Sequence, residues 1–166
     1  MVQYAGIHRQ HARGGRARYV VRAHEEEAWK QAYAALTFAV SRKVGDDSLA
    51  SKGDLYLVCG LQGAGKSTWI RNNAERLAPC VFFDAALPRA IHRRPVVDIA
   101  QSAGTTVHAV WIDATLEVAL YRNSLRTVDE RVPESSIRSV AELFEPPTEL
   151  EGYLDVLCVR SDGSQY

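Results

Sequence analysis

The residues with the clearest chemical potential lie in a glycine-rich segment at residues 60–67, which reads Gly-Leu-Gln-Gly-Ala-Gly-Lys-Ser. This fits the pattern G-x-x-x-x-G-K-[ST], and an apolar strand-like run at residues 54–59 precedes it. Glycines let the backbone turn its N–H groups inward, and the helix that follows adds positive potential at the same point. Lys66 is suited to hold the β- and γ-phosphates of a nucleotide, and the Ser67 hydroxyl to bind Mg²⁺.

We therefore expect this segment to bind the phosphates of a nucleotide together with Mg²⁺, with Lys66 acting in catalysis and Ser67 as a metal ligand. The alternative is a glycine-rich turn that binds nothing. The residues expected to contact the nucleotide are Gly60, Leu61, Gln62, Gly63, Ala64, Gly65, Lys66, Ser67 and Thr68.

Other features narrow the kind of reaction. The chain has no N-K-x-D motif for guanine, which disfavours a GTPase, and no L-S-G-G-Q signature. The second strand of this unit ends at Asp84, and the next residue is Ala85, where a hydrolytic motor usually has a glutamate to activate water. These features favour phosphate transfer to an acceptor other than water.

Asp84 is the leading carboxylate because it ends the strand after the phosphate-binding helix, at the sheet edge where ligands bind in open α/β sheets. There it would bind Mg²⁺ or accept a proton from the attacking hydroxyl. A turn cap is the alternative. For Asp113, which ends the third strand, a helix N-cap is at least as good an interpretation.

Arg122 and Arg126 are four residues apart on one predicted helix and so share a face, and Arg131 follows. Arginines stabilise the charge that develops on a transferring phosphoryl group, and a lid is one way to bring them in. Taken alone, the two arginines fit better as a solvated face that pairs with Glu117, Asp129 or Glu130.

The segment from Val107 to Val140, with Arg122 and Arg126 followed by Arg131 to Glu134, resembles the lid of phage-type polynucleotide kinases and their zeta-toxin-like relatives. Residues 65–69 (GKSTW) are similar to the phosphate-binding loop of that group, and the stretch from Glu145 to Tyr153 is similar to its ending. The resemblance covers residues 54–160. It implies a P-loop kinase with ATP as donor, Mg²⁺ as cofactor, and Arg122 and Arg126 as catalytic lid arginines.

The chain departs from this family in one respect. The family offers two carboxylates from two strands, whereas Asp84 follows Lys66 by only 18 positions. Asp84 matches either the strand that carries the acceptor's base or the later strand near the metal. If Asp84 matches the later strand, the strand that carries the acceptor's base is missing from this chain. In that case Asp84 would serve both as base and as metal ligand, or the N-terminal extension would take part in the site.

Three functions follow as hypotheses. The first is an ATP-dependent kinase that phosphorylates a hydroxyl, with nucleic-acid 5′ ends as the leading acceptor by resemblance. The second is a kinase of the same fold that acts on a small metabolite or a nucleotide-sugar. The third is an ATP-binding module without turnover.

The elements predicted to position these residues alternate between strand and helix, which indicates an α/β fold with a mainly parallel sheet. With the motif, this predicts a three-layer P-loop NTPase fold at residues 53–166. The N-terminal part, residues 1–52, is predicted as a basic arm and a helix that begins at residues 25–27, and residues 45–53 read as a linker.

Composition sets broader limits. The 166 residues carry no net charge, yet residues 1–24 hold five arginines, three histidines and no acid. This pattern fits either a solvated tail or a patch that attracts phosphates. Three cysteines with no C-x-x-C spacing favour buried thiols in a cytoplasmic protein. The absence of a long apolar stretch predicts no membrane partner.

Overall fold

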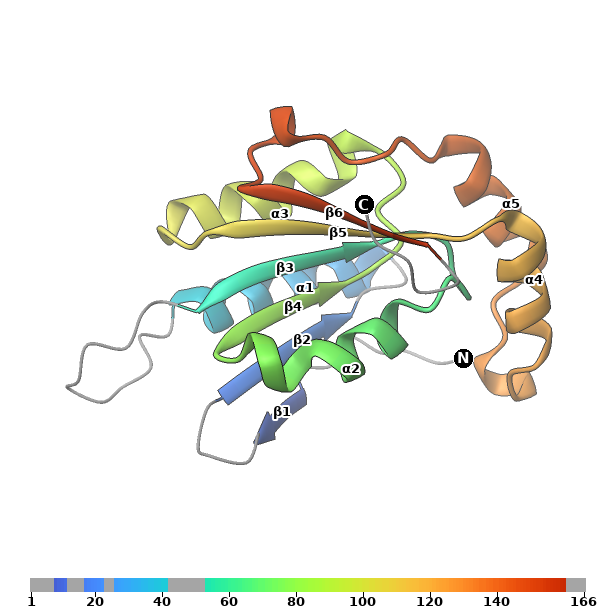
Figure 1. Ribbon diagram of the computed structural model, residues 1–166, viewed down its shortest axis with the longest axis horizontal. Coiled ribbons are helices and arrows are strands. Elements are labelled where there is room, and N and C mark those ends of the chain that lie inside the picture. Colours follow the sequence, from blue (N-terminus) through green and yellow to red (C-terminus); the bar gives the residue numbers. More distant parts are fainter. Residues whose placement is uncertain (1–7, 12–16, 23–25, 42–52, 161–166) are drawn as a thin grey trace.

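The computed structural model describes residues 8–11, 17–22, 26–41 and 53–160, and side chains within residues 32–40 and 53–160. A six-stranded sheet forms its centre, in the order β1-β2-β4-β3-β5-β6 (Figure 1). The strands are β1 (His8–His11), β2 (Ala17–Arg22), β3 (Asp54–Cys59), β4 (Cys80–Asp84), β5 (Val107–Asp113) and β6 (Asp155–Arg160). The helices are α1 (Glu26–Ser41), α2 (Lys66–Leu77), α3 (Ala90–Ser102), α4 (Leu116–Ser124), η1 (Val128–Glu130), α5 (Glu134–Leu143) and η2 (Glu149–Glu151).

Strands β4, β3, β5 and β6 are all parallel, and β2 extends the parallel part next to β4. Only β1 is antiparallel among the described strands, and it pairs with β2 at the sheet edge. Parallel strands buried on both faces are apolar along their length, and all five residues of β4 are buried. The predicted α/β class with a mainly parallel sheet is therefore confirmed.

Helices cover both faces of the sheet, which gives three layers. On one face, α1 and α3 pack against β-strand residues such as Leu57 and Phe83. On the other, α2, α4 and α5 pack against residues such as Val58 and Phe82. Alternation along β3 and β4 explains this split, because successive side chains of a strand point to opposite faces.

The helix predicted near residues 25–43 is α1, and its small-residue face is buried. Ala32, Leu36 and Ala39 are all at most 5% exposed and belong to the same core cluster as Leu57 and Phe83. The face therefore packs on the sheet of this chain. Of the predicted linker at residues 45–53, only Gly53 is among the described residues.

The strand predicted at residues 54–59 is β3, and the strands predicted to end at Asp84 and Asp113 are β4 and β5. Pro95 lies inside α3, which begins at Ala90, although proline is best accommodated in the first turn of a helix. The first turn forms without capping by a side chain of Arg89, and the backbone bonds from His92 and Arg93 to the Arg89 carbonyl close it.

The three cysteines, Cys59, Cys80 and Cys158, are buried, and none of them forms a disulfide. Burial raises the pKa of Cys59 to about 12, so this thiol stays protonated at neutral pH. None of the helices in the described residues is both long and apolar enough to cross a membrane.

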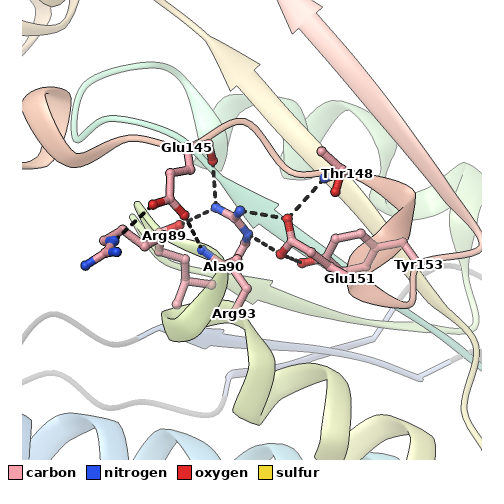
Figure 2. A network of polar contacts seen from close by, with 8 residues as sticks. Arg89, Ala90, Arg93, Glu145, Thr148, Glu151 and Tyr153 are labelled. Atoms are coloured by element: carbon pink, nitrogen blue, oxygen red, sulfur yellow. Dashed lines mark hydrogen bonds and ion pairs between the residues drawn. The ribbon is translucent and has the colours of Figure 1, made fainter.

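A fully buried arginine joins α3 to the segment between α5 and β6 (Figure 2). Arg93 donates two hydrogen bonds to the Glu151 carboxylate, at 2.7 and 2.8 Å. Its Nη1 donates to the carbonyl oxygens of Leu87 and Glu145, at 3.0 and 2.9 Å. Because Leu87 lies three residues after Asp84, this network fixes the course of the chain just beyond the candidate carboxylate.

We expect the Arg93→Ala variant to lose about 3–5 kcal/mol of unfolding free energy, because it leaves Glu151 and two carbonyl groups without their partner. The matched control is Arg94→Ala. Arg94 forms an exposed ion pair with Asp98, and such pairs contribute about 0–1 kcal/mol. Urea denaturation of both variants measures the difference, and equal losses would contradict a structural role for Arg93.

The same network predicts a pH dependence of stability. Burial alone would raise the pKa of Glu151, but bonds from Arg93, the Thr148 N–H and the Tyr153 hydroxyl outweigh it, and the net pKa is lowered from 4.5. The ionised carboxylate therefore stabilises the fold above pH 4.5, and this stabilisation is lost as the pH falls through the lower folded-state value. We expect Glu151→Gln to flatten the fall in unfolding free energy below pH 4.5, measured by urea denaturation at several pH values.

Candidate functional site

The glycine-rich loop leaves the carboxyl end of β3 directly beside the end of β4. Val58 is in register with Asp84, and the backbone pairing continues beyond the strands. The Ala85 N–H donates to the Val58 carbonyl and the Gly60 N–H to the Ala86 carbonyl, both at 3.3 Å. These bonds keep the first residue of the loop next to the segment that carries Asp84.

Glycine is required at two positions of the loop because the backbone is in the left-handed region and a neighbouring carbonyl is close. Gly60 has a φ of 134°, and a Cβ there would lie 2.5 Å from the Ile112 carbonyl oxygen. Gly63 has a φ of 90°, and a Cβ there would lie 2.4 Å from the Ala119 carbonyl oxygen. The loop is thus packed tightly against the end of β5 and against α4.

The loop leaves a group of backbone donors available. The Ala64 N–H donates to the Leu61 carbonyl, and the Thr68 and Trp69 N–H groups donate to the Gly65 carbonyl. Within residues 53–160, no hydrogen bond engages the N–H groups of the other loop and first-turn residues, which are Gln62, Gly63, Gly65, Lys66 and Ser67. Such amides at a helix N-terminus form an arrangement that can bind an anion.

Lys66 begins α2 and turns back over the loop. Its Nζ donates to the carbonyl oxygens of Gly60 and Leu61, each at 2.9 Å, and these bonds use two of its three N–H donors. Burial lowers the pKa of Lys66, the negative charge of Asp84 opposes this shift, and the positive charge of Arg126 adds to it. A buried ammonium group in this position favours the approach of an anion that would restore its charge balance.

Ser67 and Asp84 are brought together at the first turn of α2. The Ser67 hydroxyl donates to Asp84 Oδ2 at 3.0 Å, although 17 positions separate the two residues in the sequence. Mg²⁺ prefers oxygen ligands and is commonly held by one or two protein groups together with substrate phosphates. A hydroxyl and a carboxylate at this distance fit that chemistry, so Ser67 and Asp84 are the residues that would hold the ion.

Arg122 reaches the loop from α4. Its Nη1 donates to the Ala64 carbonyl at 2.8 Å, and the same atom would lie 3.5 Å from a Cβ at Gly65. The second arginine, Arg126, follows just after the end of the helix and is partly buried. Because α4 ends at Ser124, Arg126 does not lie on the same helix as Arg122, and the prediction that the two share one helix face is wrong. The positive charge of Arg126 nevertheless contributes to the lowered pKa of Lys66.

The competing interpretation of these arginines is a solvated face. All the residues concerned are described, and neither Arg122 nor Arg126 forms an ion pair with Glu117, Asp129 or Glu130. Arg131, the third arginine, donates to the Arg126 carbonyl at 2.9 Å and is exposed.

Sequence reasoning missed the residue that orders the segment after α4. Asn123 is buried, its amide nitrogen donates to the Val132 carbonyl at 2.8 Å, and its oxygen accepts from the Val132 N–H at 3.0 Å. This pair of bonds returns the chain toward α5 and holds η1 in between. A single buried asparagine does not alter the hydrophobic periodicity of a helix. The only signal in the sequence for the role of Asn123 is its position directly after Arg122.

The remaining predicted residues divide into two groups. Leu61 and Ala64 are buried and serve the packing of the loop, whereas Thr68 is exposed and accepts a bond from Arg71 at 3.4 Å. Asp113, which the sequence suggested as a helix N-cap, does not cap α4. The N-cap of α4 is Thr115, whose hydroxyl accepts a hydrogen bond from the Val118 N–H.

A cavity of about 310 Å³ lies elsewhere, between α1 and α3. It is lined by Thr37, Asp98, Ile99, Ser102 and Ala103. This is the face of the sheet opposite α2 and α4, so the cavity is separate from the loop.

No protein-family model matches the chain, and no curated protein sequence matches it either. A function for this chain is therefore inferred from the geometry of the loop.

The close packing of Gly63 gives a test of the loop geometry. We expect Gly63→Ala to lower the unfolding free energy by at least about 1–3 kcal/mol, since it adds a steric clash to the strain of a positive φ. Gly104→Ala is the matched control, because Gly104 has a φ of 65° but is exposed. Thermal denaturation compares the two, and an effect of Gly63→Ala no larger than that of the control would refute the close contact with Ala119.

Proposed function

We propose that this chain is an ATP-dependent kinase of the P-loop NTPase fold, which transfers the γ-phosphoryl group of ATP to a hydroxyl acceptor. By its resemblance to polynucleotide kinases, the leading acceptor is the 5′-hydroxyl of a nucleic acid. The observation that carries the proposal is the 3.0 Å hydrogen bond between Ser67 and Asp84 at the end of the glycine-rich loop. The bond shows that two oxygens able to bind a metal lie beside a loop whose backbone N–H groups are available to bind phosphates.

The loop would bind the triphosphate of ATP. The unengaged N–H groups of Gln62, Gly63, Gly65, Lys66 and Ser67 would donate hydrogen bonds to phosphate oxygens, and Lys66 would supply positive charge. Arg122 is positioned above the loop by its bond to the Ala64 carbonyl, where it would stabilise charge on the transferring group. Mg²⁺ held by Ser67 and Asp84 would neutralise charge on the β- and γ-phosphates.

The transfer itself requires one proton to move. The acceptor oxygen attacks the γ-phosphorus, the bond from that phosphorus to the β,γ-bridging oxygen breaks, and ADP leaves with the electron pair. The hydroxyl proton passes to a carboxylate or to solvent. Asp84 is the carboxylate within reach of Ser67, so it is the candidate base as well as a candidate metal ligand.

Transfer is favoured over hydrolysis by the residue that follows Asp84. Ala85 is 1% exposed and has no group that could activate water. Arg122 and the tight packing of α4 on the loop would also limit the access of water to the transferring group.

The test measures transfer of labelled γ-phosphate from ATP to a single-stranded oligonucleotide with a 5′-hydroxyl. We expect Lys66→Ala and Asp84→Asn each to lower kcat by about 100-fold or more, because each removes a charge that acts on the phosphates or the metal. Asp98→Asn is the control, since Asp98 pairs with Arg94 on the exposed surface of α3, and it should retain full activity.

The same assay separates the alternatives. Transfer only to small hydroxyl compounds would indicate the metabolite or nucleotide-sugar kinase. Nucleotide binding in calorimetry without transfer to any acceptor would indicate the non-catalytic module. Equal signal from the wild-type chain and Lys66→Ala would eliminate the enzyme.

A further inference from the structure

The N-terminal strands form the sheet edge beside the candidate carboxylate. β2 is the last parallel strand on this side of the sheet, and its final residue, Arg22, is in register with Asp84 at the end of β4. β1 pairs antiparallel to β2, with Arg9 opposite Tyr19. In Figure 1 the two strands lie at the edge of the sheet farthest from β6. A segment far from Asp84 in the sequence thus borders it in the fold.

The other side of the loop is closed by α4. Gly63 packs against the Ala119 carbonyl, and Arg122 bonds to Ala64. In phosphoryl transfer the attacking and leaving oxygens lie roughly in line, on opposite sides of the phosphorus. With α4 and Arg122 over the loop on the β5 side, an acceptor in line with the leaving oxygen would approach Asp84 from the side of β4 and β2.

The sheet edge on this side is basic. β1 and β2 carry three arginines and two histidines in ten residues and no acid; these are His8, Arg9, His11, Arg18 and Arg22. Arg18 and Arg22 are four residues apart, which corresponds to about 13 Å along a strand. A single small metabolite does not span that length, whereas successive phosphates of a nucleic-acid strand do.

The segment that leads to the opposite edge of the sheet is acidic in sequence, although Glu145, Glu151 and Asp155 are paired with Arg89, Arg93 and His108. Residues 141–155, which lead through α5 and η2 into β6, carry five acids and no base. The edge formed by β1 and β2 is therefore the more basic of the two in sequence, and it is the edge that would attract a polyanion.

We propose that the hairpin of β1 and β2 is the docking surface for the acceptor, a nucleic-acid strand whose terminal hydroxyl is led along β2 to Asp84. This inference rests on the proposed function for the reaction itself. Beyond that function, β1 and β2 would bind the acceptor, whereas α4 would contact the bound ATP.

Binding of a 3′-fluorescein-labelled single-stranded oligonucleotide, measured by anisotropy without ATP at several salt concentrations, tests the surface. We expect the double variant Arg9→Gln, Arg18→Gln to bind several-fold more weakly. Its slope of log K against log salt should fall by about 0.7 for each arginine removed. The matched control is Arg94→Gln, Arg138→Gln, which removes two exposed arginines from helices and should leave the slope unchanged.

Two further measurements separate a loss of oligonucleotide binding from a loss of folding or of ATP binding. Circular dichroism reports whether the double variant folds, and Arg9→Gln alone, on the edge strand, replaces it if it does not. In the transfer assay the KM for the oligonucleotide should rise while the KM for ATP stays constant.

The outcomes distinguish this inference from the proposed function. Unchanged oligonucleotide binding in the hairpin variants, or no oligonucleotide binding by the wild-type chain, overturns the docking surface even if ATP is consumed. Salt-dependent binding that needs the hairpin, without any phosphate transfer, supports the surface and refutes the kinase.

Discussion

The parallel pairing of β3 with β4 is the constraint on which the candidate site depends. It sets Val58 opposite Asp84, and two backbone bonds beyond the strands hold Gly60 beside the same segment. Only with this register does the first turn of α2 bring the Ser67 hydroxyl within 3.0 Å of Asp84. A shift of one residue would turn the Asp84 side chain to the other face of the sheet.

The rest of the molecule restricts movement around that pairing. α4 is fitted against Gly63, and the Arg93 network fixes the chain three residues after Asp84. Both supports come from segments that are distant in sequence; Arg93 and Glu151, for instance, are 58 positions apart. The site is therefore built from short local motifs but held by long-range contacts, and preorganisation of this kind lowers the reorganisation needed during a reaction.

Sequence patterns predicted the central strands well because β3, β4 and β5 are continuous apolar runs with glycine or aspartate at their ends. They also predicted a tight turn between β3 and α2, since closely spaced glycines permit the positive φ angles that Gly60 and Gly63 adopt. The burial of Arg93 was not predictable, because its partner Glu151 is brought near only by the fold. β1 was missed because its sequence, His-Arg-Gln-His, has neither apolar character nor alternation.

The place of β2 also matters for how much of the chain is needed for solubility. β4 is buried throughout, including the large side chains of Phe82 and Phe83, and β2 occupies the hydrogen-bonding edge of that strand. A fragment that began at Gly53 would present this apolar strand with unpaired backbone groups to solvent. Exposed edges of that kind pair with strands of other molecules. By covering the edge of β4, β2 would therefore prevent self-association of the chain.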